Sequence, residues 1–488
     1  MPTRYNHFAP RLGLAWSPSH GPKWLIGNEG EHAMSVRTGF GVYYNRDQEE
    51  QSLQNLIDPP SLYTSHGAAD FGGSPSFANP FADIAGNGSE KNPFPYTIPP
   101  VGGQVNWSLY NTLDLATFTP NYNVPYTYNY NLNIERSLSS TMVLMIGYVG
   151  SVSHRLATWH EGDYITPAGH ASCLGNPSCV ALGAQEHLYF PQYTAQPAIV
   201  PGTGNGAIPS LPNGLPWYLS VARQDTEGSA NYNALQARLQ KAMSHGLQFT
   251  ASYTYSHALD NASGYESSTG SAGRVYNFVP GFQYLNYGSS DFDARQRLAL
   301  GYVYVVPQVH WFNNNPVIQQ VVSGWQLSGT SSFQSGNPVG INYGATRSLW
   351  CDIYSFFGCP DVPNTSSFHI GTHNPRASSA HQYFDTGSFS AEPLGTFGNT
   401  SRNFFHGPGW NYTNLAVVKN IHFTSHSTQF VQLRLEGFNV FNHANFASPS
   451  GTFLSPTFGQ VTSVKQSADP NGDPSPGRAV QLAGKFYF

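Results

Sequence analysis

Residues 231–258, NYNALQARLQKAMSHGLQFTASYTYSHA, contain the clearest strand pattern of the chain. In the second half apolar and polar residues alternate without exception, in the order Leu247, Gln248, Phe249, Thr250, Ala251, Ser252, Tyr253, Thr254 and Tyr255. Successive side chains of a β-strand point to opposite faces, so one face of this strand suits lipid and the other suits water. The first half is ambiguous by itself, because Leu235, Leu239 and Met243 also have helical spacing. Since only Ser244–Gly246 separate the two halves, we predict a β-hairpin.

The same alternation predicts eleven strands in the whole chain. They are Arg11–Ser17, Met34–Tyr44, Thr127–Leu138, Met142–Leu156, Asn231–Met243, Leu247–Ala258, Gln296–Val306, Trp325–Gln334, Tyr412–Phe423, Gln429–Val440 and Arg478–Phe488. Arg37 and Arg238 fall on the polar face, where an arginine avoids the roughly 2 to 4 kcal/mol that mid-bilayer lipid costs. Lys419 is an exception because it falls on the apolar face. Either its side chain reaches a nearby interface or a bulge shifts the register.

The composition is unusual for a water-soluble protein of 488 residues. Charged residues make up 10% of the chain, against about 25% in ordinary soluble domains. No segment approaches the roughly 18 consecutive apolar residues of a membrane helix, so any crossing of a bilayer must use strands. The net charge of -5 argues against nucleic acid as a partner. The first residues lack the pattern of a secretory signal, so we expect either a cytoplasmic protein or a piece of a longer chain.

Long and short connections alternate along the predicted strands. The short ones are Ser139–Ser140, Ser244–Gly246 and Thr424–Ser427, and segments of tens of residues lie between them. Outer-membrane barrels have short periplasmic turns and long external loops. Counting back from the end places the carboxyl terminus in the periplasm and the amino terminus outside. Because single-chain bacterial barrels normally have even strand numbers, eleven strands predict the carboxyl-terminal part of a larger barrel.

The last strand, RAVQLAGKFYF, also alternates and ends on an aromatic residue. Phe486 and Phe488 on its apolar side resemble the terminal signal that the outer-membrane barrel assembly machinery reads. We therefore predict that this machinery is a partner.

Sequence motifs of catalysis and cofactor binding are missing. The chain has no G-x-S-x-G, H-E-x-x-H, P-loop or complete G-x-G-x-x-G pattern. We predict no catalytic residues, no cofactor and no metal site, and we interpret His154, His160, His170 and His187 as scattered loop histidines. Asp291, Asp293, Arg295 and Arg297 form a dense charged cluster just before a strand. We interpret it as a salt-bridge network at the barrel rim, with a place on the substrate path as the alternative.

The four cysteines fall in two predicted external loops. Cys173 and Cys179 lie in one loop, and Cys351 and Cys359 lie in another. Two local disulfides are expected in an oxidising compartment. A four-cysteine zinc site that joins both loops is the alternative, although its pair spacings exceed those usual for zinc.

Several stretches in succession resemble a known family. They are RLGLAWSP, VRTGFGVYYNR, residues 231–260, SDFDARQRLALGYVYVVP, GWQLSGTSSFQSGNP, RLEGFNVFNHANF and GRAVQLAGKFYF. Together they resemble the barrel of TonB-dependent transporters, specifically the Oar-like branch. The resemblance implies a barrel of twenty-two strands, of which residues 1–488 form the second half. It also implies a plug and an amino-terminal regulatory-like domain, which have no counterpart in this sequence.

These observations lead to one fold and three function classes. The fold is all-β: part of a transmembrane antiparallel β-barrel with long extracellular loops, located in the bacterial outer membrane. The resemblance implies TonB-dependent uptake of an unknown solute, coupled to the TonB complex through the missing plug. A non-transporting surface or adhesion barrel is the alternative. A secreted all-β lectin or enzyme is the third class, but the uneven strand spacing shows no propeller repeat.

Overall fold

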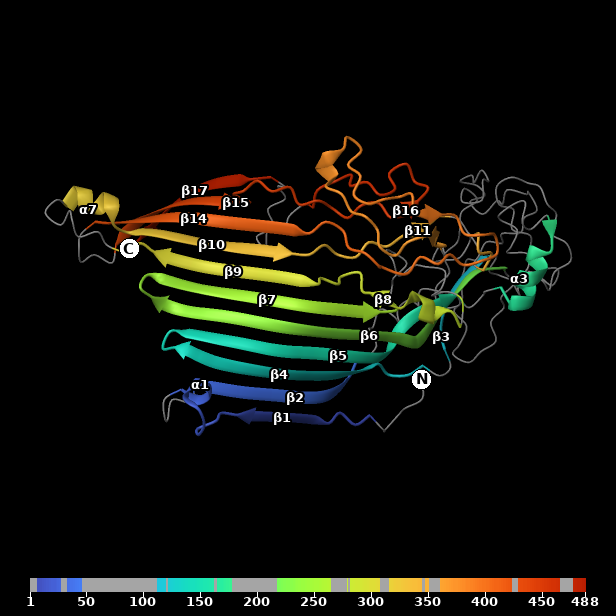
Figure 1. The fold of residues 1–488 in the computed structure, drawn as a ribbon, viewed down its shortest axis with the longest axis horizontal. Helices are drawn as coiled ribbons and strands as arrows, with labels where there is room; N and C mark the ends of the chain where they lie inside the picture. Colours follow the sequence, from blue (N-terminus) through green and yellow to red (C-terminus); the bar gives the residue numbers. More distant parts are fainter. Residues whose placement is uncertain are drawn as a thin grey trace, which may run out of the picture.

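A computed structural model describes residues 7–27, 33–45, 112–119, 122–161, 165–177, 217–264, 279, 281–307, 316–344, 347–350, 360–423, 429–465 and 477–488. Eleven long strands form one curved wall (Figure 1). They are β1 (Arg11–Trp16), β2 (Met34–Tyr44), β4 (Tyr126–Ser139), β5 (Met142–Glu161), β6 (Trp217–Ser244), β7 (Leu247–Asp260), β9 (Gln296–Val305), β10 (Trp325–Gln334), β14 (Trp410–His422), β15 (Phe430–Phe438) and β17 (Ala479–Tyr487). Each pairs antiparallel with the next strand of this series. The predicted all-β antiparallel fold is confirmed.

The two ends of the wall differ, as the alternation of connections predicts. Figure 1 shows α1 (Lys23–Ile26), α7 (Pro316–Val322) and the carboxyl terminus at the end with short turns. α3 (Pro167–Leu174) lies at the other end, beyond the long strands. We call these the turn end and the loop end. Among the described residues, no helix is long and apolar enough to cross a bilayer.

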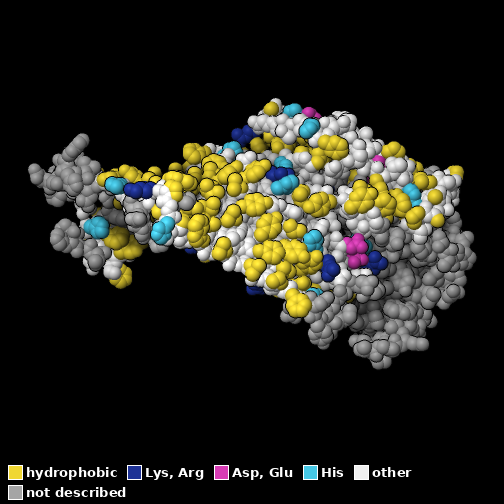
Figure 2. Space-filling view, turned by 60° about the horizontal axis from the view of Figure 1, so that its bottom comes forward, with side chains coloured by type: hydrophobic (Ala, Val, Ile, Leu, Met, Phe, Trp, Pro, Cys, Tyr) yellow, Lys and Arg dark blue, Asp and Glu magenta, His cyan; other side chains and the backbone are white. Residues whose placement is uncertain are grey.

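The strand register gives the wall an apolar face and a polar face. Leu235 lies opposite Tyr148 on one neighbour and opposite Tyr255 on the other. These three side chains are 48%, 44% and 51% exposed, so they do not form a buried core. Figure 2 shows hydrophobic side chains gathered over the strands. The predicted lipid-facing surface is therefore present on the wall.

The polar face carries charges that pair across or along strands. An Arg37 nitrogen lies 3.5 Å from a Glu135 oxygen, and Arg434 lies 2.6 Å from Glu436. The guanidinium of Arg238 donates to the Gln240 side chain at 3.1 Å. Arg238 and Arg434 are each flanked by two apolar residues, as the alternation predicts, whereas Glu135 is followed by Arg136.

Lys419 is buried against the end of α7, and no bulge is needed to place it. The pairings of β14 with β10 and β15 have no register shift at this position. Its ammonium group donates to the carbonyls of Gln320 and Ser323, at the end of α7. It also lies 5.2 Å from the ring centroid of Trp325, whose indole donates to the Val321 carbonyl at 2.8 Å. A cation and an indole therefore satisfy the last carbonyls of α7 at the turn end.

The structure departs from the predicted strands at the loop end. β6 begins at Trp217 instead of Asn231, and β5 continues to Glu161 instead of Leu156. β3 (Thr112–Phe118) adds to β6 in parallel, and β8 (Gly288–Ser289) pairs with β7. These segments lack a lipid-facing side, so residues such as Gln224–Gly228 show no alternation of apolar and polar types.

Two long loops fold together into a small domain at the loop end, which we call the cap. Its short strands are β11 (Asn342–Tyr343) with β16 (Thr452–Phe453), and β12 (Asn364–Thr365) with β13 (Phe389–Ser390). Its buried core consists of Val339, Ile341, Phe384, Phe389, Phe405 and Phe453. Phe453 comes from the β15–β17 connection and the other five from the β10–β14 connection, so the cap is a joint product of both loops.

Candidate functional site at the loop end

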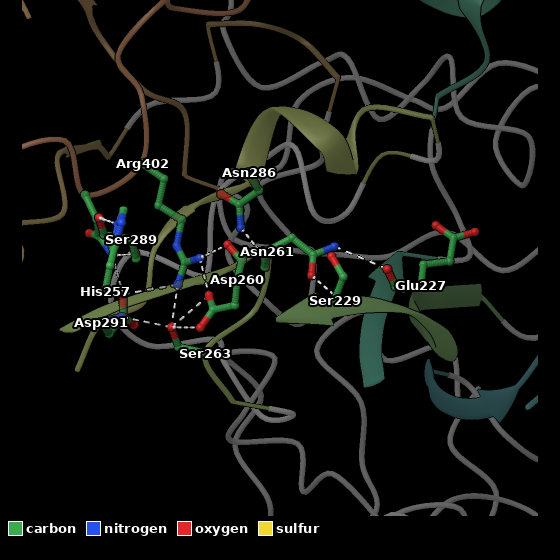
Figure 3. Close-up of polar contacts among 11 residues, drawn as sticks. Glu227, Ser229, His257, Asp260, Asn261, Ser263, Asn286, Ser289, Asp291 and Arg402 are labelled. Atoms are coloured by element: carbon green, nitrogen blue, oxygen red, sulfur yellow. Dashed lines mark hydrogen bonds and ion pairs between the residues drawn. The ribbon is translucent and has the colours of Figure 1, made fainter. Parts of the chain in front are cut away.

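A buried arginine connects the cap to the wall. Arg402 belongs to the β10–β14 connection, and its side chain is 0% exposed. Its Nη1 donates to Asp260 at the end of β7, at 2.8 Å to the carbonyl and 2.5 Å to Oδ1. Its Nη2 donates to Ser263 at 2.6 Å and to Asp291 at 3.3 Å (Figure 3). Three chain segments therefore meet at one guanidinium.

Asn403 extends this contact. Its amide donates to the Ser289 carbonyl at 2.6 Å and to Asp291 Oδ1 at 2.8 Å. Asn286 in turn donates to the Asn261 carbonyl at 2.7 Å. The segment 286–291 is thus bound by Asn403 on one side and by Asn261 on the other, and Figure 3 shows Asn286 and Asn261 joined beside Arg402 and Asp260.

The predicted rim cluster lies directly beside this network. Asp293 is 1% exposed, and its Oδ1 accepts the Ala258 N–H at 2.8 Å. Arg295 Nε donates to Asp293 Oδ2 at 2.7 Å, and His406 Nε2 lies 3.3 Å from the same oxygen. Burial raises the pKa of Asp293, but the hydrogen bonds and the cations around it outweigh burial and hold this pKa below its usual range.

The structure brings together three of the four residues of that cluster. Asp291 and Asp293 contact the cap, and Arg295 contacts Asp293. Arg297 lies further along β9, opposite Gln334 and Thr254. The network contains Arg402 and Asp260, which the sequence did not single out. They are separated by 142 residues, and no local pattern indicates such a contact.

A second junction is built from aromatic rings. His170 of α3 stacks on Trp350 at 4.1 Å between ring centroids, and its Nε2 lies 2.8 Å from the Ser348 carbonyl. Phe282 and Phe397 lie 5.4 and 5.8 Å from Trp350. Trp350 thus packs three loops against one another.

The structure describes only some of the remaining residues that the sequence analysis singled out. Cys173 is fully buried in α3 and is disulfide-bonded. Cys179, Cys351 and Cys359 lie outside the described residues, so the predicted pairing stays a prediction. Phe486 and Phe488 lie at the turn end, 54% and 93% exposed, with ring centroids 5.9 Å apart. Their role as an assembly signal also stays a prediction.

Below the loop end, the wall has two grooves with polar side chains. One, of about 490 Å³, crosses β7, β9, β10, β14 and β15, and its lining includes Thr250, Ser328 and Asn414. The other, of about 340 Å³, crosses β2, β4, β5 and β6 around Arg37 and Glu135. Gly301 leaves open space at its Cβ position in the first groove. Both grooves therefore combine polar side chains with apolar ones.

The geometry agrees with a family comparison. A family model described as "Outer membrane beta barrel domain" matches residues 1–481. The chain belongs to this outer membrane β-barrel family. The predicted location in the bacterial outer membrane is confirmed. In this family's orientation the loop end of the barrel lies outside the cell and the turn end lies in the periplasm.

Solved structures that match this chain over nearly all of its length come from several bacteria. The outer membrane transporter YddB from Escherichia coli has 9% identity and a TM-score of 0.45, over 98% of this chain and 40% of that one. The siderophore receptor PirA from Pseudomonas aeruginosa has 9% identity and a TM-score of 0.34, over 98% and 42%. The FrpB iron transporter from Neisseria meningitidis has 9% identity and a TM-score of 0.36, over 98% and 39%. This chain therefore spans about two fifths of the length of each of these three proteins. No curated protein matches its sequence.

Proposed function

We propose that this chain is the carboxyl-terminal part of the barrel of an Oar-like, TonB-dependent uptake receptor that captures an unknown solute with its external loops. The observation that carries the proposal is the combination of a preassembled cap, anchored by Arg402, with a polar wall below it. A fixed outer surface suits recognition, because loops that are already ordered lose less entropy when a ligand binds. A hydrophilic inner wall suits passage of a polar solute.

In this proposal the chain acts without catalysis or a cofactor. Energy comes from the TonB complex, which contacts a plug encoded outside residues 1–488. The barrel assembly machinery inserts the chain through its last strand, and outer-membrane lipid contacts the apolar face.

Deletion of the gene in its native host tests the proposal. Mutant and parent strains are compared for growth on single solutes at limiting concentration, with and without an active TonB complex. We expect one solute class whose uptake requires both the gene and TonB. Loss of cell attachment with unchanged uptake of every solute would instead establish the adhesion barrel and refute the receptor.

A further inference from the structure

We propose that the outer ends of β5 and β6 form a site for a divalent transition-metal ion such as Zn²⁺, held by His160, Asp225 and Glu227. The ligand atoms of these three side chains all lie within 4.8 Å of one another. Imidazole nitrogen and carboxylate oxygen are ligands that Zn²⁺ uses in proteins.

The spacing of these atoms is close to that of a bound ion. Two ligands at about 2.1 Å from one tetrahedral Zn²⁺ are about 3.4 Å apart. His160 Nε2 and Glu227 Oε2 are already 3.6 Å apart. The side chain of Glu227 is 52% exposed, so it has room to adjust, and it leaves one side of the site open to water. His160 and Asp225 are 1% and 8% exposed, and they supply fixed positions.

Neighbouring groups hold the ligands in place. The Thr226 N–H donates to Asp225 Oδ1 at 2.7 Å, and Asp225 Oδ2, which accepts from Arg223 in this structure, is the oxygen that would bind the ion. The side-chain amide of Gln283 lies 3.2 Å from His160 Nδ1 and orients the ring. Binding through Nε2 puts the ring proton on Nδ1. Because Gln283 Oε1 already accepts the Gly281 N–H at 2.9 Å, ion binding requires the Gln283 amide to flip and give up this hydrogen bond. Arg223 lies 3.4 Å from Asp225, and the ion replaces it as the partner of that carboxylate.

The location gives such an ion a role. The β5–β6 ladder shifts register twice, between His154 and Leu156 and between Leu156 and Thr158, and Arg155 has a φ of 58°. Backbone pairing is therefore interrupted where the two strands leave the wall. Pairing resumes from Thr158 with Asp225 to Glu161 with Ala222, and an ion held by His160 from β5 and by both acidic residues from β6 adds a cross-link to this short outer ladder. Figure 3 shows the Glu227 side chain pointing away from Arg402, while the Glu227 carbonyl accepts the Asn261 side-chain amide at 3.3 Å, so the two sites are neighbours.

Metal binding by the protein tests the proposal. The chain is expressed from its complete reading frame, extracted from outer membranes in detergent and stripped with a chelator. Zn²⁺ binding is measured by equilibrium competition with a chromophoric chelator, and Co²⁺ is added separately to record its visible absorption. We expect one tight ion per chain. Because Glu227 is half-exposed, Glu227→Gln should fold normally and bind at least about tenfold more weakly. His160→Ala should abolish the Co²⁺ band.

His154 provides a matched control on the same strand. It lies among the rings of Tyr126 and Tyr128, with centroid distances of 5.4 and 6.0 Å, and His154→Ala should leave Zn²⁺ binding unchanged. Bound Zn²⁺ should also slow amide exchange at residues 156–161 and 222–228 in the parent and not in Glu227→Gln. Absence of stoichiometric binding by the folded parent overturns the proposal. So does equal weakening by His154→Ala and His160→Ala.

Discussion

Replacement of Arg402 by methionine should release the cap from the barrel. The arginine side chain is fully buried, and Asp260, its main partner, is 2% exposed. Removal of one partner from a buried ion pair leaves an uncompensated charge, and typically costs about 3 to 5 kcal/mol. Methionine has a similar length, so the change removes the charge and the hydrogen bonds more than it removes volume. The equilibrium constant for opening of the cap should increase on the order of 100-fold or more.

Amide hydrogen exchange on the folded protein measures this opening directly. Faster exchange is expected at residues 286–292 and 399–406, while the paired amides of β7 and β9 keep their protection. Arg376→Met is the control, since Arg376 is exposed on the cap and stacks on Phe446 at 5.6 Å. Its effect should stay within about 0.5 kcal/mol.

A second substitution separates charge from shape. In the double variant Arg402→Met with Asp260→Asn, the buried carboxylate is neutral, so protection should recover in part. The reasoning is refuted if Arg402→Met exchanges no faster than Arg376→Met. It is also refuted if the double variant loses as much additional protection as Asp260→Asn costs in the otherwise unchanged protein.

Three further predictions concern the cap and its titratable groups. Phe384→Ala should weaken the cap by about 3 to 5 kcal/mol, because Phe384 is fully buried in the aromatic core, and exchange in the wall should not change. Despite burial, His406 and the other partners of Asp293 lower the pKa of its carboxyl group. The charged carboxylate should therefore stabilise the cap at neutral pH, and this stabilisation should disappear as pH falls through and below about 4. Asp293→Asn should remove this pH dependence in a proteolysis series from pH 7 to 3. Glu392 is 1% exposed, with Arg347 at 3.9 Å, and burial raises the pKa of its carboxyl group. The charged form therefore destabilises the cap as pH rises, so Glu392→Gln should slow proteolysis of the loops at pH 7. Faster cleavage of this variant would contradict the assignment.

The wall could be predicted from sequence because lipid on one side and water on the other impose a period of two. Met34–Tyr44 and Trp325–Gln334 coincide with the predicted strands to the residue. The same rule marked Lys419 as an exception, and the structure supplies the carbonyls that satisfy it.

The loop end could be predicted only in outline. The acidic and basic residues from Asp291 to Arg297 are adjacent in sequence, so their cluster was visible. The contact between Arg402 and Asp260, and the convergence of His160 with Asp225, join segments that are far apart and have no periodic pattern. Such contacts arise from the packing of whole loops, which one sequence does not encode in any local signal.

The shared core of the cap limits how its specificity can be exchanged. Phe453 and Phe458 enter a cluster supplied mostly by the other loop, and the Tyr383 N–H donates to the Gly459 carbonyl at 2.8 Å. A chimaera that receives only one of these two loops from a relative therefore receives only part of the core of the cap. Both loops must be grafted together if the outer surface is to keep its shape. A substitution that changes the size of an aromatic ring in one loop requires a compensating substitution in the other.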